Sequence, residues 1–393
     1  MQLEQIESIV IQVLAGTLEP DQAAAELDID QQTFDHWLKA FRAGGLRQLK
    51  HLARRRDALS VAVVSARPYD QRTLDAALPD GINIQLEYFS ERLDSETAGM
   101  VAGFDVVCAF VNDRLDRKCL ERLVHHGIRA IALRCAGFNQ VDIKAAAELG
   151  LVITRVPGYS PEAVAEHALM LMLALNRKII RTHRRVFEGN FALEGLLGFN
   201  MNQRTLGIVG TGRIGTALAR MLNGFHCHRL AYDPQPNPEC EALGCEYVGL
   251  DELIERSHII SLHCPLNETT HHMINPESLQ RMRDGVMIIN TGRGALIDTR
   301  AIIEGLKTGK IGYLGLDVYE QEEQLFFQDH SAEIITDDIF QRLLTFPNVL
   351  ITGHQGFFTD HALKEIAETV MGELVALAEH RPPNHAISVE SNA

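Results

Sequence analysis

The residues Gly210-Thr211-Gly212-Arg213-Ile214-Gly215 join an apolar run at 206–209 to a helical pattern at 216–222, which indicates a turn between a strand and a helix. The first glycine of such a turn permits the tight bend, the second lets the backbone approach a pyrophosphate, and the third lets the helix pack close to the strand. The N-terminus of the helix offers free N–H groups and a partial positive charge to phosphates. The pattern therefore predicts a dinucleotide site in a βαβ unit.

An acid, Asp233, ends the next apolar run at 230–233. A carboxylate at this position accepts hydrogen bonds from the ribose hydroxyls of adenosine and repels a 2′-phosphate, so it favours NAD over NADP. The alternative is a glycine turn in a βαβ unit that binds no cofactor. The residues expected at the dinucleotide are Gly210, Gly212, Arg213, Ile214, Gly215 and Asp233.

The composition excludes several classes of protein. The 393 residues carry a formal net charge of −15, which argues against bulk non-specific binding to nucleic acid or to an anionic membrane surface. No apolar run approaches the ~20 residues that cross a bilayer, and the first residues lack the basic segment of a signal peptide. Seven scattered cysteines without a CxxC pair predict reduced thiols in a cytoplasm, with neither a disulfide framework nor a metal site.

Apolar runs alternate with helical patterns from residue 59 onward, which predicts parallel, doubly wound α/β sheets in two domains. We expect one long helix over 162–185 and a last helix over 359–379 that returns to the first domain. Strands are predicted at 60–65, 82–89, 106–110 and 128–133 in the first domain, and at 206–209, 230–233, 259–263, 286–290, 313–318 and 349–352 in the second.

Residues 1–57 have a different texture, with three helical patterns that resemble a helix-turn-helix. Residues 1–38 hold eight acids and no lysine or arginine, whereas residues 39–56 hold seven lysines and arginines and no acid. The helix in the recognition position, at 31–37, carries little positive charge for phosphates. Two interpretations stay open: a helical appendage that docks or oligomerises, and a DNA-binding segment. A second helix is expected at 21–27. The apolar positions are Ile6, Ile9, Val10, Val13 and Leu14 in the first pattern and Phe34, Trp37, Leu38 and Phe41 in the third.

Three polar residues, Arg293, Glu322 and His354, follow strands of the second domain, where open α/β sheets place their ligands. Arginine bonds a carboxylate through two parallel hydrogen bonds, and histidine titrates near working pH and can deliver a proton. A carboxylate bonded to that histidine fixes its ring and favours its charged form. Taken singly, an arginine, a histidine and a glutamate at such positions are more often ordinary surface or loop residues than functional ones. Their shared position beside a dinucleotide site favours hydride transfer to the carbonyl of an anionic substrate.

Residues ~60–390 resemble the D-isomer-specific 2-hydroxyacid dehydrogenases, in particular the bacterial fermentative D-lactate dehydrogenases. The resemblance implies a Rossmann NAD domain at 159–357 and a discontinuous, flavodoxin-like substrate domain at 58–158 and 358–393, with residues 1–57 as an additional α-helical appendage. The matching stretches are Phe110-Val111-Asn112-Asp113, residues 131–139, residues 161–168, residues 260–266, residues 290–298, Asp317-Val318-Tyr319-Glu320, Leu325-Phe326-Phe327 and Thr352-Gly353-His354-Gln355.

The same resemblance implies a reaction, the reversible reduction of pyruvate to D-lactate by NADH. His354 would be the general acid/base with Glu322 as its partner, and Arg293 would bind the substrate carboxylate. The turn 135–137 would offer backbone N–H groups to that carboxylate. The further substrate contacts would be Cys135, Ala136, Gly137, Tyr159 and Phe357, and the further cofactor contacts Cys264, Pro265, Thr291 and Asp317.

Two glycines, Gly158 and Gly356, stand where family members commonly carry bulkier residues, which would relax the limit on substrate size. The alternatives are therefore a dehydrogenase for a bulkier 2-keto acid, or a NAD-sensing regulatory protein with a DNA-binding N-terminal segment. The expected partners are a small 2-keto or 2-hydroxy acid and further copies of the chain in a dimer or tetramer. No membrane partner is expected.

Overall fold

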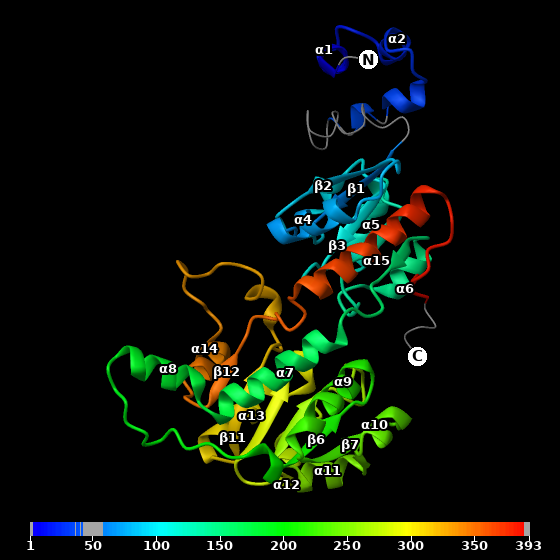
Figure 1. Ribbon diagram of the computed structural model, residues 1–393. Helices are drawn as coiled ribbons and strands as arrows, with labels where there is room; N and C mark the ends of the chain where they lie inside the picture. The colour runs from blue at the N-terminus through cyan, green and yellow to red at the C-terminus, as the bar shows by residue number, and fades with distance from the viewer. Residues whose placement is uncertain (1–2, 36, 40, 42–57, 389–393) are drawn as a thin grey trace. The chain divides into compact units, whose positions relative to one another are not determined.

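The computed structural model describes residues 3–35, 37–39, 41 and 58–388, and the chain divides into two compact units (Figure 1). One unit comprises Met1–Tyr159 and Asp360–Ala393, and the other comprises Ser160–Thr359. Each unit contains one sheet in which every paired strand is parallel. The predicted α/β class with two doubly wound parallel sheets is therefore confirmed.

The first unit has a five-stranded sheet in the order β2-β1-β3-β4-β5, which is the strand order of flavodoxin-like folds. The last helix of the chain, α15, packs against α4, β2 and β4, and Ala386 beyond it forms an isolated antiparallel bridge with Thr154 of β5. The elements are β1 Leu59–Val63, α4 Pro68–Ala77, β2 Ile84–Tyr88, η1 Ala98–Val101, β3 Val106–Ala109, α5 Arg117–His125, β4 Ala130–Leu133, α6 Ile143–Glu148, β5 Val152–Thr154 and α15 Asp360–Ala378.

The second unit has a seven-stranded sheet in the order β12-β11-β10-β9-β6-β7-β8, with helices on both faces (Figure 1). The strand order reverses between β6 and β9, so a ligand crevice is expected at the carboxyl ends of these strands. The strands and flanking helices are α7 Pro161–Asn176, α8 Ile179–Phe187, β6 Thr205–Val209, α9 Arg213–Leu222, β7 His228–Tyr232, α10 Pro238–Ala242, β8 Glu246–Tyr247, α11 Leu250–Arg256, β9 Ile259–Leu262, α12 Pro276–Arg281, β10 Val286–Asn290, α13 Thr299–Thr308, β11 Ile311–Leu316, α14 Asp338–Leu344 and β12 Val349–Ile351. Short 3-10 turns are η2 Met201–Gln203, η3 Asn223–Phe225, η4 Gly294–Leu296 and η5 Glu322–Gln324.

Along each strand of the second unit, successive side chains point to opposite faces of the sheet and pack into two separate hydrophobic cores. On β10, Met287 and Ile289 join the core beneath α7 and α9, whereas Ile288 joins the core beneath α11 and α13. Strands buried on both faces carry nearly continuous apolar sequence, which explains why the runs at 259–263 and 286–290 were recognisable.

The single helix predicted over 162–185 is wrong, because the chain breaks between α7 and α8. Lys178 lies between them in the left-handed conformation, with φ of +49°. The Asn176 side chain bonds both the N–H and the carbonyl of Phe199, and Lys178 Nζ donates to the carbonyl of Leu197. A distant segment of the chain therefore fixes the break.

The N-terminal residues form α1 Leu3–Leu14, α2 Pro20–Glu26 and a third helical segment at 31–35, 37–39 and 41. Asp30 caps the third segment, where its carboxylate accepts hydrogen bonds from the Thr33 N–H at 2.8 Å and the Thr33 hydroxyl at 2.6 Å. Leu14 ends α1 and is exposed, so it lies outside the small core of these helices. The small core of these helices consists of Ile6, Ile9, Val10, Ala23, Ala24, Leu27, Phe34, Trp37 and Leu38.

Two features bear on the environment of the protein. In the part of the chain that the structure describes, no helix has the length and apolar character of a membrane span. All seven cysteines are unpaired thiols.

Candidate active site

The three glycines of the turn after β6 have different surroundings. Gly210 has φ of +92°, and a Cβ there would lie 2.6 Å from the backbone nitrogen of Cys264. A Cβ on Gly215 would lie 2.0 Å from the Gly210 carbonyl oxygen, whereas a Cβ on Gly212 would meet no atom within 4 Å. The first and third glycines are therefore required by packing, and the second leaves the backbone open to a ligand.

The N-terminus of α9 is free to bind an anion. Gly212 is the N-cap residue and supplies no side-chain cap, and Arg213 follows as an exposed first residue. Asp233, after β7, accepts hydrogen bonds from the Thr211 N–H at 2.7 Å and the Gln235 N–H at 3.0 Å. The acid thus holds the turn in shape and remains partly exposed beside it.

The carboxyl end of β9 closes the other side of this crevice. The His263 N–H donates to the Val209 carbonyl at 2.7 Å, so the ends of β6 and β9 are joined. Burial lowers the pKa of His263 to about 4, and Nε2 of its ring lies 2.8 Å from the Ser261 hydroxyl. His263 is therefore neutral at physiological pH, and burial likewise raises the pKa of the neighbouring Cys264 to about 11.

Thr291, after β10, has a buried hydroxyl without a hydrogen-bond partner in the described part of the chain. A buried polar atom without a partner is unfavourable unless a ligand satisfies it. This hydroxyl, the open backbone at Gly212, the uncapped helix and Asp233 together fit a dinucleotide whose ribose lacks a 2′-phosphate.

A second cluster forms on the loops after β11 and β12. His354 Nδ1 lies 2.8 Å from Glu322 Oε1, and both side chains are less than one-fifth exposed. The other oxygen of Glu322 accepts a hydrogen bond from the Tyr319 N–H at 2.9 Å, which fixes the carboxylate. With Nδ1 engaged by Glu322, Nε2 of the ring is the nitrogen available for proton transfer.

Asp317 holds the loop that carries His354. Its carboxylate is buried and accepts hydrogen bonds from the Thr352 hydroxyl at 2.5 Å and from the N–H groups of Gln355 and Gly356 at 2.9 and 2.8 Å. His354 itself has φ of +52°, and its N–H donates to the Asp317 carbonyl at 2.7 Å. Left-handed backbone in a non-glycine residue is strained, and such strain clusters at functional sites.

His167, on α7, lies 3.2 Å from the Asp317 carboxylate and 2.9 Å from the Thr352 hydroxyl. Burial would raise the pKa of Asp317, but the hydrogen bonds from His167 and Thr352 outweigh it, and the net direction is downward. His167 was not expected beside the loop of His354, because a histidine within a helical run gives no signal of a partner on a distant strand.

Arg293 follows β10, the neighbour of β11, on the same edge of the sheet. The Asn290 side chain donates to the Arg293 carbonyl at 2.8 Å and accepts from the Gly292 N–H at 3.0 Å, so it shapes this loop. A Cβ on Gly294 would lie 2.2 Å from the Tyr319 backbone, so the Arg293 loop packs directly against the loop that leads to Glu322. Arg293 remains partly exposed.

The other predicted residues lie as follows. Phe357 is buried and packs edge-on against Phe358 in the second unit. Cys264 and Pro265 begin the loop after β9. Cys135, Ala136 and Gly137 form a turn after β4 in the first unit, where Tyr159 is partly buried at the end of the continuous segment.

The turn 135–137 has its carbonyl groups occupied by the protein. The Cys135 carbonyl accepts from Val156 N–H, the Ala136 carbonyl from Arg155, and the Gly137 carbonyl from the Cys135 thiol, each at 3.2 Å. Within the described residues, the N–H groups of Ala136 and Gly137 donate to no other group. The turn therefore offers donors to an anion.

Known proteins share this architecture. A family model for the "D-isomer specific 2-hydroxyacid dehydrogenase, NAD binding domain" matches residues 169–356. A 2-hydroxyacid dehydrogenase homolog of Haemophilus influenzae is 51% identical over 319 residues, which are 81% of this chain and 96% of that protein. The D-lactate dehydrogenase of Escherichia coli is 50% identical over 316 residues, which are 80% of this chain and 96% of that protein.

Solved structures agree. The apo-structure of D-lactate dehydrogenase from Escherichia coli has a TM-score of 0.75 at 46% identity and covers 84% of this chain and 99% of that one. The structure of a D-2-hydroxyisocaproate dehydrogenase has a TM-score of 0.72 at 29% identity, with coverage of 84% and 99%. The chain belongs to the D-isomer-specific 2-hydroxyacid dehydrogenases. It is an oxidoreductase whose cofactor is NAD.

A winged helix-turn helix model matches residues 8–66, so the predicted likeness of the N-terminal segment is confirmed. Leu59–Val63, near the end of that match, form β1 of the parallel sheet. The match to this family model therefore overlaps the first strand of the sheet of the first unit.

Proposed function

We propose that this enzyme is a D-lactate dehydrogenase that reduces pyruvate with NADH. The observation that carries the proposal is the hydrogen-bonded pair of His354 and Glu322 at the edge of the sheet that also presents Arg293. The 50% identity with the Escherichia coli D-lactate dehydrogenase supports the choice of substrate.

Three residues of the chain have separate roles in the proposed reaction. When bound, NADH would supply the hydride that C2 of the keto acid accepts. As the C–H bond forms, the carbonyl π electrons move to oxygen, which takes a proton from Nε2 of the His354 imidazolium. Glu322, bonded to Nδ1, orients the ring and stabilises its charged form. Arg293 binds the substrate carboxylate through its planar fork and polarises the carbonyl.

The remaining contacts are part of the proposal. The turn 135–137 would bind the substrate carboxylate through N–H groups, because its carbonyls are already bonded. Asp317 would act at the nicotinamide side through the loop it holds. Tyr159 and Phe357 would contact substrate. The proposed cofactor residues are Gly210, Gly212, Arg213, Ile214, Gly215, Asp233, Cys264, Pro265, Thr291 and Asp317.

A bulkier 2-keto acid is the competing substrate, supported by Gly158 and by the structural likeness to a D-2-hydroxyisocaproate dehydrogenase. At Gly356, a Cβ would lie 3.0 Å from the Asp317 carboxylate, so the absence of a side chain there also relieves crowding of that acid. NADH oxidation with pyruvate, 2-ketobutyrate, phenylpyruvate and 2-ketoisocaproate tests the assignment. The highest kcat/KM with pyruvate supports it, and a preference for a larger acid contradicts it.

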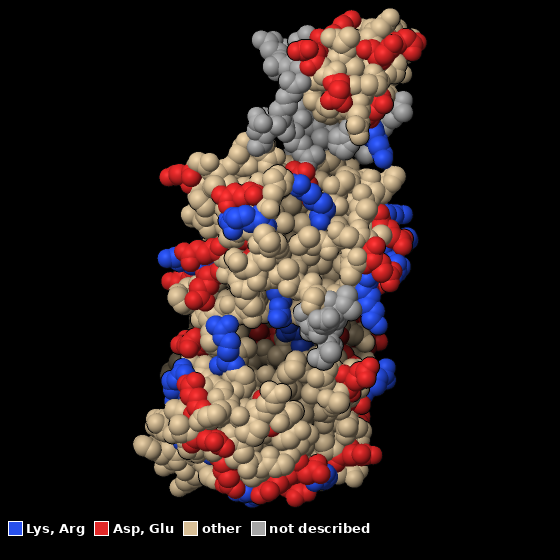
Figure 2. All heavy atoms as spheres, turned by 90° about the vertical axis from the view of Figure 1, so that its right-hand side faces the viewer, with Lys and Arg blue, Asp and Glu red and all other residues tan. Residues whose placement is uncertain are grey.

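A second function, binding of duplex DNA by residues 1–57, is favoured by the match to a winged helix-turn helix. Gln31 and Gln32 are exposed at the start of the third helix, where this motif reads bases, and the basic run at 39–56 would supply phosphate contacts. Acidic side chains are visible on the N-terminal helices in Figure 2. The attraction of the basic run for DNA phosphates must therefore outweigh the repulsion between these acids and the phosphates.

Fluorescence anisotropy with duplex DNA, at low and high salt, tests this second function on the full chain. Binding that weakens steeply with salt and falls in a Gln31→Ala/Gln32→Ala variant, but not in Gln12→Ala on α1, supports it. Equal affinity of all three proteins, or no binding at low salt, refutes it. Dependence of the DNA affinity on NADH would extend the function to NAD sensing.

We also propose that the enzyme is a homo-oligomer, a dimer or tetramer, located in the cytoplasm. The unpaired thiols suit a reducing compartment. A cluster of exposed apolar side chains on α8 and the following loop suits a second copy of the chain. These side chains are Ile179, Ile180, Val186, Phe187, Phe191, Leu193 and Leu197.

A further inference from the structure

One arginine, Arg134, is almost completely buried in the first unit, with 2% of its surface exposed. It directly follows β4 and directly precedes the turn 135–137. A buried guanidinium is unfavourable unless its charge is paired and its N–H groups are bonded. Its contacts therefore indicate what it is retained for.

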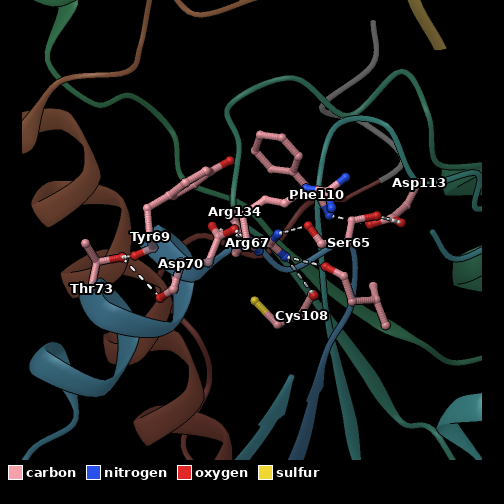
Figure 3. Close-up of polar contacts among 10 residues, drawn as sticks. Ser65, Arg67, Tyr69, Asp70, Thr73, Cys108, Phe110, Asp113 and Arg134 are labelled. Atoms are coloured by element: carbon pink, nitrogen blue, oxygen red, sulfur yellow. Dashed lines mark hydrogen bonds and ion pairs between the residues drawn. The ribbon is translucent and has the colours of Figure 1, made fainter. Parts of the chain in front are cut away.

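The Arg134 side chain binds the carboxyl ends of two neighbouring strands while its own backbone extends a third (Figure 3). Nη1 donates to the Val64 carbonyl after β1 at 2.9 Å and to the Cys108 carbonyl in β3 at 3.1 Å. Nη2 donates to the Ser65 carbonyl at 3.3 Å, and the Arg134 N–H donates to the Ala109 carbonyl at 2.9 Å. One residue thus fixes three strand ends against each other.

The charge of Arg134 is balanced by Asp70 on α4, whose Oδ1 lies 3.2 Å from Nε. Asp70 is itself buried, and its second oxygen accepts a hydrogen bond from the Arg67 N–H at 2.9 Å. Burial would lower the pKa of Arg134, but the neighbouring acidic groups, Asp70 foremost and Asp113 among them, together outweigh it, and the net direction is upward. The guanidinium therefore stays charged, and its face packs on the Phe110 ring, 5.0 Å from the centroid.

Two of the residues that contact Arg134, Ser65 and Phe110, also contact a second buried acid, Asp113 (Figure 3). Its carboxylate accepts hydrogen bonds from the Ser65 hydroxyl and the Phe110 N–H, both at 2.6 Å. Ser65 and Phe110 are thus each held by Arg134 and by Asp113. The segments after β1 and β3 are fixed from two sides, and the turn after β4 is anchored to them through Arg134.

We propose that Arg134 is a positioning residue for substrate binding, which holds the N–H groups of the turn 135–137 in the geometry that a 2-keto acid carboxylate requires. The inference rests on the proposed function. Arg134 reaches the substrate only through the turn that follows it. Its loss displaces the carboxylate-binding donors and leaves the NADH site in the second unit unchanged.

The test compares the full-length wild-type enzyme with an Arg134→Met/Asp70→Asn variant, which removes both buried charges together. We expect the KM for pyruvate and the dissociation constant of oxamate, an unreactive isostere, to rise at least about tenfold, since loss of a hydrogen bond to a carboxylate costs about a factor of ten or more in affinity. The kcat at saturating pyruvate and the affinity for NADH should change less than about threefold.

Arg134→Lys is the second variant, because it keeps the buried charge beside Asp70 and tests the proposal if the double variant does not fold. Lysine lacks the fork that spans several carbonyls, so the KM should again rise. The matched control is Arg229→Met in the second unit, where a buried arginine donates to the Ala219 carbonyl at 3.0 Å. It should lower the unfolding temperature and leave the KM unchanged.

The outcomes distinguish failure of the role of Arg134 from failure of the proposed function. An active wild-type enzyme and a folded Arg134→Lys variant with wild-type KM and oxamate affinity would overturn the role of Arg134 alone. A parallel fall in kcat and NADH affinity, with unchanged KM, would also overturn it, because that pattern indicates general loss of structure. A wild-type enzyme that binds NADH but turns over no 2-keto acid would overturn the proposed function itself.

Discussion

His354 and Glu322 form the hydrogen-bonded pair on which the proposed proton transfer depends. His354→Gln preserves the approximate size of the side chain but cannot deliver a proton at neutral pH. We expect kcat to fall by roughly 10²–10⁴-fold, the usual contribution of a general acid, with the NADH dissociation constant unchanged. Stopped-flow turnover and fluorescence titration measure the two quantities. His361→Gln, at an exposed position on α15, is the control, and equal turnover of both variants would remove His354 from the mechanism.

His263 predicts a pH dependence of stability. Burial lowers its pKa from 6.5 to about 4, so the unfolded chain binds the proton more readily than the folded chain. The contribution to stability is full above pH 6.5 and is lost as the pH falls from 6.5 to 4, by at most about 1.4 kcal/mol per pH unit. Urea unfolding at pH 7, 6 and 5 should show a steeper decline for the wild-type enzyme than for His263→Asn. Parallel curves would contradict this account.

His354, Glu322 and Arg293 could be proposed from the sequence because each follows a recognisable buried strand, and the carboxyl ends of parallel strands share one edge. The sequence gave no role to His167 or Arg134. Each lies beside ordinary apolar sequence, and its partner, Asp317 or Asp70, is distant in the chain. Such pairs become visible only when the fold brings the elements together.

In the turn between β6 and α9, one glycine is needed for folding and another for cofactor binding. Gly212→Ala places a Cβ in open space, so the protein should fold normally and bind NADH at least about tenfold more weakly, because the backbone can no longer approach the pyrophosphate. Gly215→Ala should lower the unfolding temperature, since its Cβ would collide with the Gly210 carbonyl. Calorimetric titration and thermal unfolding measure the two effects. Gly224→Ala, which also meets no atom, is the control; NADH affinity of Gly212→Ala equal to that of the control would refute the assignment.

The strands were the most predictable elements, since those buried on both faces are continuous apolar runs. Two short strands were missed, β5 Val152–Thr154 and β8 Glu246–Tyr247. The break between α7 and α8 was also missed. Neither glycine nor proline marks it, and its cause is hydrogen bonding to residues that come later in the chain.

At the scale of the whole molecule, the apolar cluster on α8 predicts self-association. Phe187 is 88% exposed, and a charge placed there should disrupt an apolar contact between copies. Light scattering after size exclusion should give the mass of a dimer or tetramer for the wild-type enzyme and a smaller mass for Phe187→Glu. Ile334→Glu, at a position 90% exposed elsewhere in the second unit, should keep the wild-type mass. A wild-type mass of ~44 kDa, that of one chain, would refute the proposal.

The most direct test of the central claim is the reaction of the purified full-length chain with pyruvate and NADH, followed by chiral chromatography of the product. The proposed function predicts oxidation of NADH in equal amount to the lactate formed, and lactate of the D configuration alone. Formation of L-lactate, or tight NADH binding without oxidation in the presence of pyruvate, would contradict it.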